Sequence, residues 1–526
     1  MKVLVREQIA EAGIDLLRER FEVDVEPDGD LAGRIGDYDA IIIRSGTHLT
    51  ADLIERAGRL KVIGRAGVGI DNVDLEAASR RGILVANAPE STIVSAAEHT
   101  LGLLLALSRS IPQAYAALKE GRWERSRFAG HELAGKTLGL VGFGRIGRQV
   151  ARLARGLDMR VLAFDPYVAA ERFEEIGVVR VETLAGLLAE VDFVSLHLTL
   201  TEDTHGLIGA AELAGAKDGI QLVNAARGEL VDEAALVEAL RSGKVAGAAL
   251  DVFSEEPYSG PLLELPNVVV TPHLAASTEE AQDRAGVIVA EQVAAALEGR
   301  VVTNAVNVPA VAADEVGYLG PFLPLAAKLG ALAVELTDGS PSRLEFAYLG
   351  ELAGHDTRLL TVAALNGAFQ GRVEQAVNYV NAPLLAAERG IEVTEERRRA
   401  SRDFTSLVRV TAAGRGGDVI VAGTTRGREA EPRLVRALGY EIEIDLAPYM
   451  LFAANDDRPG RIGRLGTLLG ESGVNIANMA VSRRSRSPKG ALMALTLDSV
   501  PAPELLERVE SEPGFSDVRF IDLSRA

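Results

Sequence analysis

Three residues with complementary chemistry, Arg227, Glu256 and His273, each come after an apolar stretch that is predicted to form a β-strand. A histidine can exchange a proton near neutral pH, and a carboxylate can stabilise its charged form. An arginine can hold a carboxylate through two parallel hydrogen bonds. Because the carboxyl ends of strands line the ligand crevice of an open α/β sheet, these residues are candidates for dehydrogenation of a hydroxy acid. That reaction also needs a cofactor that accepts the hydride.

Each of these residues also has a structural interpretation. An arginine at a strand end usually forms a surface ion pair, and a glutamate before a proline usually solubilises a loop. Any one of the seven histidines is more often structural than catalytic. His197, which ends the apolar stretch Asp192–Leu196, is the main rival for the proton-transfer role. The three residues alone therefore leave the catalytic and structural interpretations about equally supported.

The sequence of residues 138–147 runs from an apolar strand directly into Gly-x-Gly-x-x-Gly. In that pattern Gly142 permits a tight turn, Gly144 lets a pyrophosphate approach the backbone, and Gly147 lets the helix pack on the strand. The spacing alone is weak evidence in a chain with 53 glycines. The strand before it and the helix expected at Arg148–Leu157 make it a strong prediction of dinucleotide binding.

Asp165 ends the second predicted strand of this unit, Arg160–Phe164. A carboxylate there can accept hydrogen bonds from the adenosine ribose and repels a 2′-phosphate. Pro166 and Tyr167 follow it, with no adjacent cation to bind that phosphate. NAD is therefore predicted rather than NADP.

Composition limits the classes of function. The chain has 526 residues, 56 basic and 75 acidic side chains, a net charge of −19 and no cysteine. The negative charge argues against nucleic-acid and anionic-membrane partners, and no metal site is predicted. The first residues indicate a strand rather than a signal peptide, and the apolar stretch Leu101–Leu107 is too short to cross a bilayer. A cytoplasmic protein of several domains is expected.

Two α/β domains with Rossmann-like parallel sheets are predicted in the N-terminal half, because strands and helices alternate there. Strands are expected at Lys2–Val5, Glu22–Val25, Ala40–Ile43, Lys61–Gly64 and Ile83–Val85, with helices at Ile9–Arg20 and Ala51–Ala57. A long helix from Thr92 leads out of this unit, and another at Glu279–Leu297 returns to it. The first domain is thus expected to be discontinuous, 1–97 and 281–308, around a dinucleotide-binding domain at 98–280.

The C-terminal half has a different character. Residues 309–447 combine Leu/Ala-rich helices with alternating strands and are expected to form an α+β domain with no catalytic set. Residues 448–526 follow a β-α-β-β-α-β order, with helices at Ile462–Glu471 and Pro503–Glu510 and a strand opening at residues 473–476. That order predicts a ferredoxin-like module.

Several motifs stand in an order that resembles the D-isomer-specific 2-hydroxyacid dehydrogenase family. They are Gly64–Asp74, Asn87–Pro89, the glycine-rich turn, Asn224–Gly228, Asp251–Pro257 and Pro272–Ser277. Within that family the chain is similar to a long form that carries an intervening domain and a terminal ACT module. The similarity extends over essentially the whole chain.

The resemblance implies a role for each matching residue. His273 would be the acid/base, Glu256 would hydrogen-bond its imidazole, and Arg227 would orient the substrate carboxylate and polarise the C2 oxygen. The implied NAD contacts are Gly142, Gly144, Arg145, Ile146, Gly147, Asp165, Ala225, Ala226, Arg227, Asp251, His273, Leu274, Ala275 and Ala276. The implied substrate contacts are Arg44, Ser45, Arg65, Ala66, Gly67 and Asn87, with Arg122 and Arg125, beside the sole Trp123, reaching from a neighbouring subunit.

The activity implied by the resemblance is NAD-linked oxidation of 3-phospho-D-glycerate to 3-phosphohydroxypyruvate, the first step of phosphorylated serine synthesis, by a homotetramer. One alternative is another D-2-hydroxyacid dehydrogenase or a hydroxypyruvate reductase. A second, of another class, is a nucleotide-sensing corepressor, which would need no complete Arg/Glu/His set.

Regulation by L-serine is expected at the terminal module. Residues 455–460 join a strand to a helix, so their backbone N–H groups can hold a carboxylate. Asp457 can pair with an amino group, Asn475 can supply amide contacts, and Asn455 opens the loop as a third candidate; a turn with an Asx cap explains the same residues. ACT modules of similar enzymes bind serine between subunits. In the intervening domain Lys328, Arg426 and Arg428 are weaker candidates for an anion site, against a role as solvated surface charges.

Overall fold

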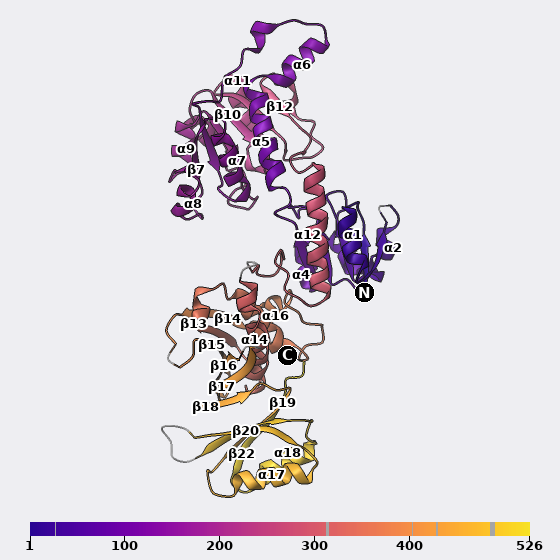
Figure 1. Cartoon of the computed structure of the whole chain (residues 1–526), viewed down its shortest axis with the longest axis vertical. Helices are drawn as coiled ribbons and strands as arrows, with labels where there is room; N and C mark the ends of the chain where they lie inside the picture. The colour runs from indigo at the N-terminus through magenta and orange to yellow at the C-terminus, as the bar shows by residue number, and fades with distance from the viewer. Residues whose placement is uncertain (27, 312–314, 402, 428–429, 484–489, 526) are drawn as a thin grey trace.

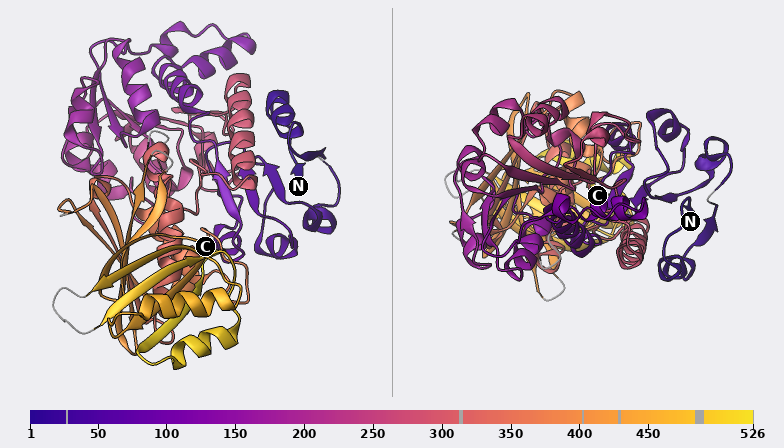
Figure 2. Two further views of the ribbon diagram at one scale, coloured as in Figure 1. Left: turned by 60° about the horizontal axis from the view of Figure 1, so that its bottom comes forward. Right: turned by 90° about the horizontal axis from the view of Figure 1, so that it is seen from above.

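The computed structural model describes residues 1–526 except 27, 312–314, 402, 428–429, 484–489 and 526. Four units are arranged along its longest axis (Figure 1). The first unit is built on β1–β5 and α12, the second on β6–β12, the third on β13–β18 and the fourth on β19–β22. Figure 2 shows the same units from two other directions, with the two termini at separate places on the molecule.

The first unit is a five-stranded parallel sheet in the order β2-β1-β3-β4-β5. Its elements are β1 (Lys2–Val5), α1 (Glu11–Arg18), β2 (Glu22–Val25), α2 (Leu31–Arg34), β3 (Ala40–Ile43), α3 (Ala51–Arg56), β4 (Val62–Arg65), α4 (Leu75–Arg80) and β5 (Leu84–Asn87). Helix α1 is shorter than the helix predicted over Ile9–Arg20. Helices α2 and α4 were not predicted. Both lie in polar stretches with little apolar periodicity.

Helix α12 (Glu279–Leu297) has the predicted bounds. It leaves the second unit and packs on the first, as expected. It lies directly on α1, where a Cβ built on Gly13 would be 2.6 Å from the carbonyl oxygen of Gly286. A Cβ on Gly64 of β4 would be 2.7 Å from the side chains of Val289 and Val293. Glycine at these positions therefore lets the returning helix approach the sheet closely.

The second unit is a seven-stranded parallel sheet in the order β12-β11-β10-β9-β6-β7-β8. Its strands are β6 (Thr137–Val141), β7 (Arg160–Phe164), β8 (Val179–Arg180), β9 (Phe193–Leu196), β10 (Ile220–Asn224), β11 (Val245–Leu250) and β12 (Val268–Val270). Its helices are α5 (Ile93–Ser108), α6 (Ile111–Lys119), α7 (Arg145–Arg155), α8 (Ala170–Glu174), α9 (Leu184–Glu190), α10 (Ala210–Gly215) and α11 (Glu233–Ser242). The two predicted Rossmann-like sheets are confirmed.

The predicted start of the helix after the glycine-rich turn was wrong. Helix α7 begins at Arg145, directly after the extended Gly144, and not at Arg148. The prediction began where apolar periodicity begins, whereas the turn itself starts the helix. Gly147 consequently lies in its first turn, where a Cβ would be 2.4 Å from the Gly142 carbonyl oxygen.

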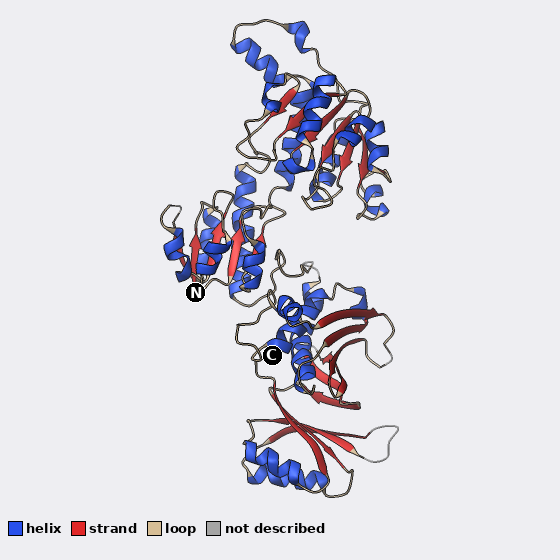
Figure 3. Ribbon diagram, turned by 180° about the vertical axis from the view of Figure 1, so that it is seen from behind, coloured by secondary structure: helices blue, strands red, loops and turns tan. Residues whose placement is uncertain are grey.

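The third unit has a six-stranded mixed sheet in the order β14-β13-β15-β16-β17-β18, with its helices on one face (Figure 3). Its elements are α13 (Val316–Leu319), α14 (Phe322–Glu335), β13 (Arg343–Gly350), α15 (Arg358–Phe369), α16 (Ala382–Glu388), β14 (Glu392–Arg398), β15 (Ser406–Gly414), β16 (Gly417–Arg426), β17 (Glu431–Ala437) and β18 (Tyr440–Asp445). Gly330 and Gly367 bring α14 and α15 into backbone contact. With its helices packed on a mixed sheet, this unit has the predicted α+β architecture.

The fourth unit is an antiparallel sheet in the order β20-β21-β19-β22, with both helices on one face (Figure 3). Its elements are β19 (Tyr449–Asn455), α17 (Arg461–Glu471), β20 (Ile476–Arg483), β21 (Ala491–Leu497), α18 (Pro503–Ser511) and β22 (Phe515–Asp522). The ferredoxin-like order is confirmed. The strand expected to open at residue 473 begins at Ile476, because Gly473 has a φ of 73° and belongs to the turn.

The third and fourth units share one hydrophobic core. Buried Met450, Phe452 and Ile521 of the fourth unit belong to the same cluster as Leu434 of the third. The guanidinium of Arg519 on β22 also donates to the Leu336 carbonyl oxygen at 2.7 Å and lies 3.2 Å from the Asp338 carboxylate. These two units therefore form one packed body.

Among the described residues, no single helix is long and apolar enough to cross a membrane. Helices α5 and α6 meet the length and composition only as a pair, and they are bent by 62°. In the same residues, no group of three or more histidine, aspartate or glutamate side chains is arranged to hold a metal ion.

Candidate active site

Two ion pairs join the first unit to the second. The guanidinium of Arg227, after β10, lies 3.4 Å from the Asp71 carboxylate of the first unit. Arg145, at the start of α7, lies 3.1 Å from Glu90. A Cβ on Gly69 would be 2.6 Å from Arg227 Nη2, so the loop after β4 packs directly against this arginine. Both arginines therefore face the opposing unit.

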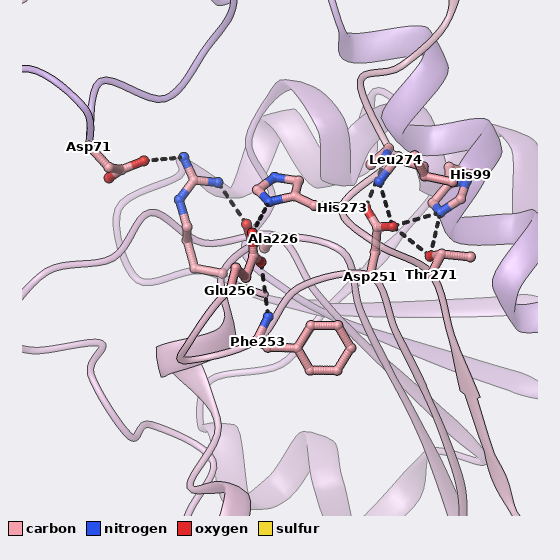
Figure 4. A network of polar contacts seen from close by, with 11 residues as sticks. Asp71, His99, Ala226, Asp251, Phe253, Glu256, Thr271, His273 and Leu274 are labelled. Carbon is pink, nitrogen blue, oxygen red and sulfur yellow. Dashed lines mark hydrogen bonds and ion pairs between the residues drawn. The ribbon is translucent and has the colours of Figure 1, made fainter. Parts of the chain in front are cut away.

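His273 and Glu256 form a direct pair (Figure 4), and both line a cavity of about 530 Å³ whose walls come from the second unit. His273 Nδ1 lies 2.9 Å from Glu256 Oε2, and the other oxygen, Oε1, accepts a hydrogen bond from the Phe253 backbone at 3.2 Å. The His273 side chain is 49 % exposed and its backbone is left-handed, with a φ of 55°. Because Nδ1 is engaged by Glu256, proton exchange with a bound molecule falls to Nε2. The imidazole is thus oriented by a carboxylate as an acid/base requires.

Asp251, at the carboxyl end of β11, holds the loop that carries His273. Its carboxylate is fully buried and accepts hydrogen bonds from the backbone of Leu274 at 2.7 Å and Ala275 at 2.8 Å. His99 and the Thr271 hydroxyl complete its contacts. Burial acts to raise the pKa of Asp251, but these hydrogen bonds outweigh it and lower the pKa. The carboxylate is therefore ionised and fixes the loop.

The substrate candidates of the first unit lie at the carboxyl ends of β3, β4 and β5. Arg44 and the exposed Ser45 follow β3, Arg65 ends β4, and Asn87 ends β5 and donates to the Val68 carbonyl oxygen at 2.6 Å. Ala66 is buried, and Gly67 has a φ of 152° at a point where a Cβ would meet the Arg65 guanidinium. The loop thus bends around Arg65.

Arg65 lies near two other arginines of the site, Arg227 and Arg44. It is half-buried, and its buried Nε has no hydrogen-bond partner among the described residues. Burial and the nearby positive charge of Arg227 lower its pKa, the carboxylates of Asp71 and Glu7 act in the opposite direction, and Arg44 lowers it further. Cations placed so near one another cost electrostatic free energy. An anion with more than one negative charge would relieve that cost.

Glu7, a residue that was not predicted, fixes the loop that carries Arg44. Its Oε1 accepts hydrogen bonds from the backbone N–H groups of Arg44 at 2.8 Å and Thr47 at 2.9 Å, and Oε2 accepts one from Gly46 at 3.1 Å. Asn72 donates to the Arg44 carbonyl oxygen at 2.7 Å. These contacts join segments far apart in sequence, so no local pattern indicates them.

The glycine-rich turn fits a dinucleotide. Gly142 has a φ of 96°, and a Cβ there would be 2.4 Å from the His197 carbonyl oxygen. A Cβ on Gly144 would meet no atom within 4 Å, so the backbone at this position faces open space where a pyrophosphate can approach. Asp165 accepts hydrogen bonds from the backbone of Phe143 and Tyr167, at 2.8 and 2.9 Å. Its carboxylate is thus fixed beside the turn.

His197 is a poor match for the acid/base. Its Nε2 lies 3.0 Å from the Ser195 hydroxyl, and burial lowers its pKa to about 4. It has a hydroxyl partner, where His273 has a carboxylate partner that stabilises the imidazolium. The geometry therefore favours His273 over this rival.

The three effector candidates already have partners within the chain. Asn455 is buried, donates to the Ala491 carbonyl oxygen at 3.2 Å and accepts from the Asp457 backbone at 2.9 Å. Asp457 pairs with Arg483 at 2.7 Å, and Asn475 donates to Asp498 at 2.6 Å. Asn455 ends β19 whereas Asn475 precedes β20, and the strand register places them at opposite ends of the sheet. One chain therefore does not bring all three together.

The remaining candidates are scattered. Lys328 is half-buried and donates to the Leu446 carbonyl oxygen at 2.7 Å, and burial lowers its pKa. Arg426 is exposed at the end of β16, and Arg428 lies outside the described residues. Trp123 is 77 % exposed beyond α6, where Arg122 pairs with Glu120 at 2.6 Å and Glu124 at 2.8 Å and Arg125 begins a short 3-10 helix.

Three family models match the chain. Residues 101–275 match the NAD binding domain of D-isomer specific 2-hydroxyacid dehydrogenases, residues 318–437 the D-3-phosphoglycerate dehydrogenase intervening domain, and residues 449–514 the ACT domain.

Similar proteins span the whole chain. D-3-phosphoglycerate dehydrogenases from Archaeoglobus fulgidus and Mycobacterium tuberculosis are 43 % and 44 % identical, each over 99 % of this chain and over 100 % and 99 % of their own length. Among solved structures, a Thermus thermophilus protein covers 58 % of this chain at 39 % identity and a TM-score of 0.54, over 100 % of its own length. The D-lactate dehydrogenase of Escherichia coli covers the same share at 29 % identity and a TM-score of 0.52, also over 100 % of its length.

Proposed function

The chain belongs to the D-3-phosphoglycerate dehydrogenases of the D-isomer-specific 2-hydroxyacid dehydrogenase family, and on that premise we propose that it oxidises 3-phospho-D-glycerate to 3-phosphohydroxypyruvate with NAD. This reaction is the first step of phosphorylated L-serine synthesis. The observation that carries the proposal is the His273–Glu256 pair, at 2.9 Å, together with the cluster of Arg44, Arg65 and Arg227. A proton acceptor and several cations are what a phosphorylated hydroxy acid requires.

The proposed proton path uses His273 and Glu256. His273 Nε2 accepts the proton of the substrate C2 hydroxyl, and Glu256 stabilises the imidazolium that results. NAD, when bound, supplies the acceptor for the hydride that leaves C2. In the reverse direction His273 returns the proton to the C2 oxygen. Glu256 also fixes the ring, because its second oxygen is held by the Phe253 backbone.

We assign the substrate anions to the arginines. Arg227 orients the C1 carboxylate and polarises the C2 oxygen, on which negative charge develops when the hydroxyl proton leaves. Arg44, Ser45, Arg65, Ala66, Gly67 and Asn87 surround the rest of the substrate, with Arg65 best suited to a highly charged group because of its unpaired Nε. Arg122 and Arg125 are assigned to the phosphate of a substrate that is bound in a neighbouring subunit, because they lie in an exposed segment on either side of the exposed Trp123.

The proposed NAD site lies along the carboxyl edge of the second sheet. Gly142, Gly144, Gly147, Arg145 and Ile146 would hold the pyrophosphate and Asp165 the adenosine ribose. The nicotinamide end would contact the segments that follow β10, β11 and β12, namely Ala225–Arg227, Asp251 and His273–Ala276. In this arrangement the first unit, 1–97 with 281–308, is the substrate-binding domain, and 98–280, 309–447 and 448–526 are the NAD-binding, intervening and ACT domains.

The proposal is tested by comparing kcat/KM for 3-phospho-D-glycerate with that for D-glycerate and D-lactate, with NAD as the cofactor. A preference for the phosphorylated acid of roughly a hundredfold or more is expected from the lost charge-assisted contacts. Equal or greater activity on an unphosphorylated acid, or on hydroxypyruvate in the reverse direction, would instead support the other dehydrogenases. NAD binding without turnover of any acid would support the corepressor.

Cofactor choice gives a second prediction. The double substitution Asp165→Ser and Pro166→Arg is expected to raise the ratio of kcat/KM for NADP to that for NAD, because it removes a repulsive charge and adds a phosphate partner. The increase should be at least tenfold, from about 1.4 kcal/mol of differential binding. Asp158→Ser, a change at a loop aspartate outside the site, is the matched control. A wild-type enzyme that already prefers NADP would contradict the assignment of Asp165.

We propose that L-serine is the effector of the ACT module. We also propose that the protein is a homotetramer and works in the cytoplasm. The ACT domain supports a small-molecule effector. Asn455 and Asn475 lie at opposite ends of one sheet, so two modules placed about a two-fold axis would join the Asn455 end of one to the Asn475 end of the other. Serine binding would then stabilise one assembly and change activity at a distance.

Calorimetry with L-serine tests this assignment. Wild-type protein is expected to release binding heat at millimolar serine or below, and Asp457→Ala to lose most of it, since the amino group of serine would replace Arg483 as the partner of Asp457. Glu510→Ala, at an exposed position of α18, should bind serine as the wild type does. An absence of heat in the wild type would leave the module as an oligomerisation element.

A further inference from the structure

The loop that carries His273 depends on one buried carboxylate. Asp251 has no exposed surface, and both of its oxygens accept hydrogen bonds from the loop, through the N–H groups of Leu274 and Ala275 and the hydroxyl of Thr271 at 2.5 Å. The Asp251 carbonyl oxygen also accepts from the His273 N–H at 2.8 Å. A buried carboxylate is costly unless every oxygen is well bonded, so each donor to Asp251 also supports the loop.

One donor to Asp251 comes from outside the loop. His99 on α5 places its Nε2 3.2 Å from Asp251 Oδ1 and 3.1 Å from the Thr271 hydroxyl oxygen, as Figure 4 shows. Its side chain is 24 % exposed, whereas Asp251 is buried. Thr271 gives its only hydroxyl hydrogen to Asp251, so both oxygens that face His99 act as acceptors toward it. His99 Nε2 must therefore carry a hydrogen, which it shares between them.

We propose that His99 is a positioning residue for catalysis, which holds His273 in place through Asp251 and Thr271. The proposal rests on the proposed function, since it concerns the residue assigned there as the acid/base. His99 touches neither His273 nor the assigned substrate arginines; it acts on the segment that they share with the cofactor site. Its Nε2–H contacts Thr271, which precedes His273, and the Asp251 carboxylate. That carboxylate in turn holds Leu274 and Ala275, which follow His273.

The left-handed backbone of His273 explains why such support is needed. A non-glycine residue with a φ of 55° is held there by its surroundings rather than by its own preference. If Asp251 loses a donor, the turn is free to relax, and the 2.9 Å contact between His273 and Glu256 is the first catalytic distance affected. Displacement of a reacting group by about 1 Å can cost roughly a hundredfold in rate.

The position of His99 also connects the loop to the junction of the first two units. Helix α5 begins just after the chain leaves the first unit, and α12 begins just after the His273 loop. These two connections are tied together, because Arg284 of α12 donates twice to the Ser91 carbonyl oxygen, at 3.0 and 2.9 Å. His99 adds a bond between α5 and the loop itself. His99 thus ties the turn that carries His273 to the helix that begins at this junction.

Two substitutions at His99 separate positioning from folding. His99→Leu keeps the volume roughly similar but removes the N–H, and His99→Gln supplies an amide N–H that can reach the same two oxygens. His131→Leu, at an exposed histidine in the segment before β6, is the matched control. For each protein we would measure kcat and KM for 3-phospho-D-glycerate, the melting temperature, and amide hydrogen exchange of the peptide that spans Thr271–Ser277.

His99→Leu is expected to lower kcat by roughly tenfold to a hundredfold, with KM for phosphoglycerate changed less than threefold because the substrate arginines are untouched. Exchange at Leu274 and Ala275 should become at least about tenfold faster, since their common acceptor is less well fixed. His99→Gln should recover most of both losses, and His131→Leu should match the wild type.

The exchange measurement needs no substrate, so it separates this proposal from the proposed function. If wild-type protein fails to oxidise phosphoglycerate, the function is wrong, while faster exchange in His99→Leu alone would still support the positioning role. Unchanged exchange and kcat in His99→Leu would overturn the proposal. It would also be overturned if His99→Gln were as impaired as His99→Leu with both proteins stably folded, because the donated hydrogen would then not be what matters.

Discussion

Replacement of His273 with asparagine is expected to lower kcat for 3-phospho-D-glycerate oxidation by roughly 10²–10⁴, because the general base is lost. Asparagine preserves the size and polarity of the side chain and tolerates the left-handed backbone found at this position. NADH affinity, measured by fluorescence titration, should stay within a few-fold of the wild type. His273→Ala should lose the same activity, since neither side chain accepts a proton.

His197→Ala is the comparison for this first prediction. Because His197 is bonded to Ser195 and its pKa is lowered to about 4, its removal should change kcat far less than removal of His273. Near-normal turnover in His273→Asn together with an inactive His197→Ala would transfer the acid/base role to the rival histidine. Glu256→Gln belongs to the same series and should shift the pH profile of kcat, since the charge that stabilises the imidazolium is removed.

Removal of the Arg227 side chain should have the second largest effect. Arg227→Ala is expected to reduce kcat/KM by roughly 10²–10³, because the guanidinium is assigned to stabilise the charge that develops on the C2 oxygen. Arg227→Lys should recover only part of this loss, since an ammonium keeps the charge but lacks the planar pair of donors. Initial rates at several substrate concentrations measure both parameters.

The ion pair between Arg227 and Asp71 calls for a separate control. Asp71→Asn removes the 3.4 Å contact between the two units and leaves the guanidinium in place. If the role of Arg227 is catalytic, Asp71→Asn should retain most of the activity. A loss as large as that of Arg227→Ala would show that the bridge between the units, rather than contact with substrate, explains the effect.

The parts of this protein that sequence predicted well are those with local signals. The glycine-rich turn combines a strand, three glycines and a helix within a few residues, and the structure gives each glycine the expected space. Helix α12 begins at Glu279, after the Thr278 cap, as its pattern indicated. The β-α-β-β-α-β module was likewise predicted in order, because each element is short and separated by turn residues. Sheet order, in contrast, has no local signal.

The residues that were missed act over long sequence separations. Glu7 supports a loop nearly forty positions away, and His99 meets Asp251 and Thr271 from a different helix. Within α5 the signal for His99 is a histidine beside Glu98 in a largely apolar helix, which indicates a polar partner but not which one. The effector candidates show a related limit, since Asn455 and Asn475 are close in sequence but lie at opposite ends of a sheet.

The most direct test of the central claim is transfer of deuterium from substrate to cofactor. The purified protein would be given 3-phospho-D-glycerate deuterated at C2 together with NAD, and both products would be examined by mass spectrometry. The expected result is 3-phosphohydroxypyruvate without the label and reduced NAD with one deuterium, formed by the wild type and formed by His273→Asn at a rate roughly 10²–10⁴ times lower. Substrate that keeps its deuterium while no NAD is reduced would contradict the claim that this chain is an NAD-dependent dehydrogenase that oxidises C2 of 3-phospho-D-glycerate.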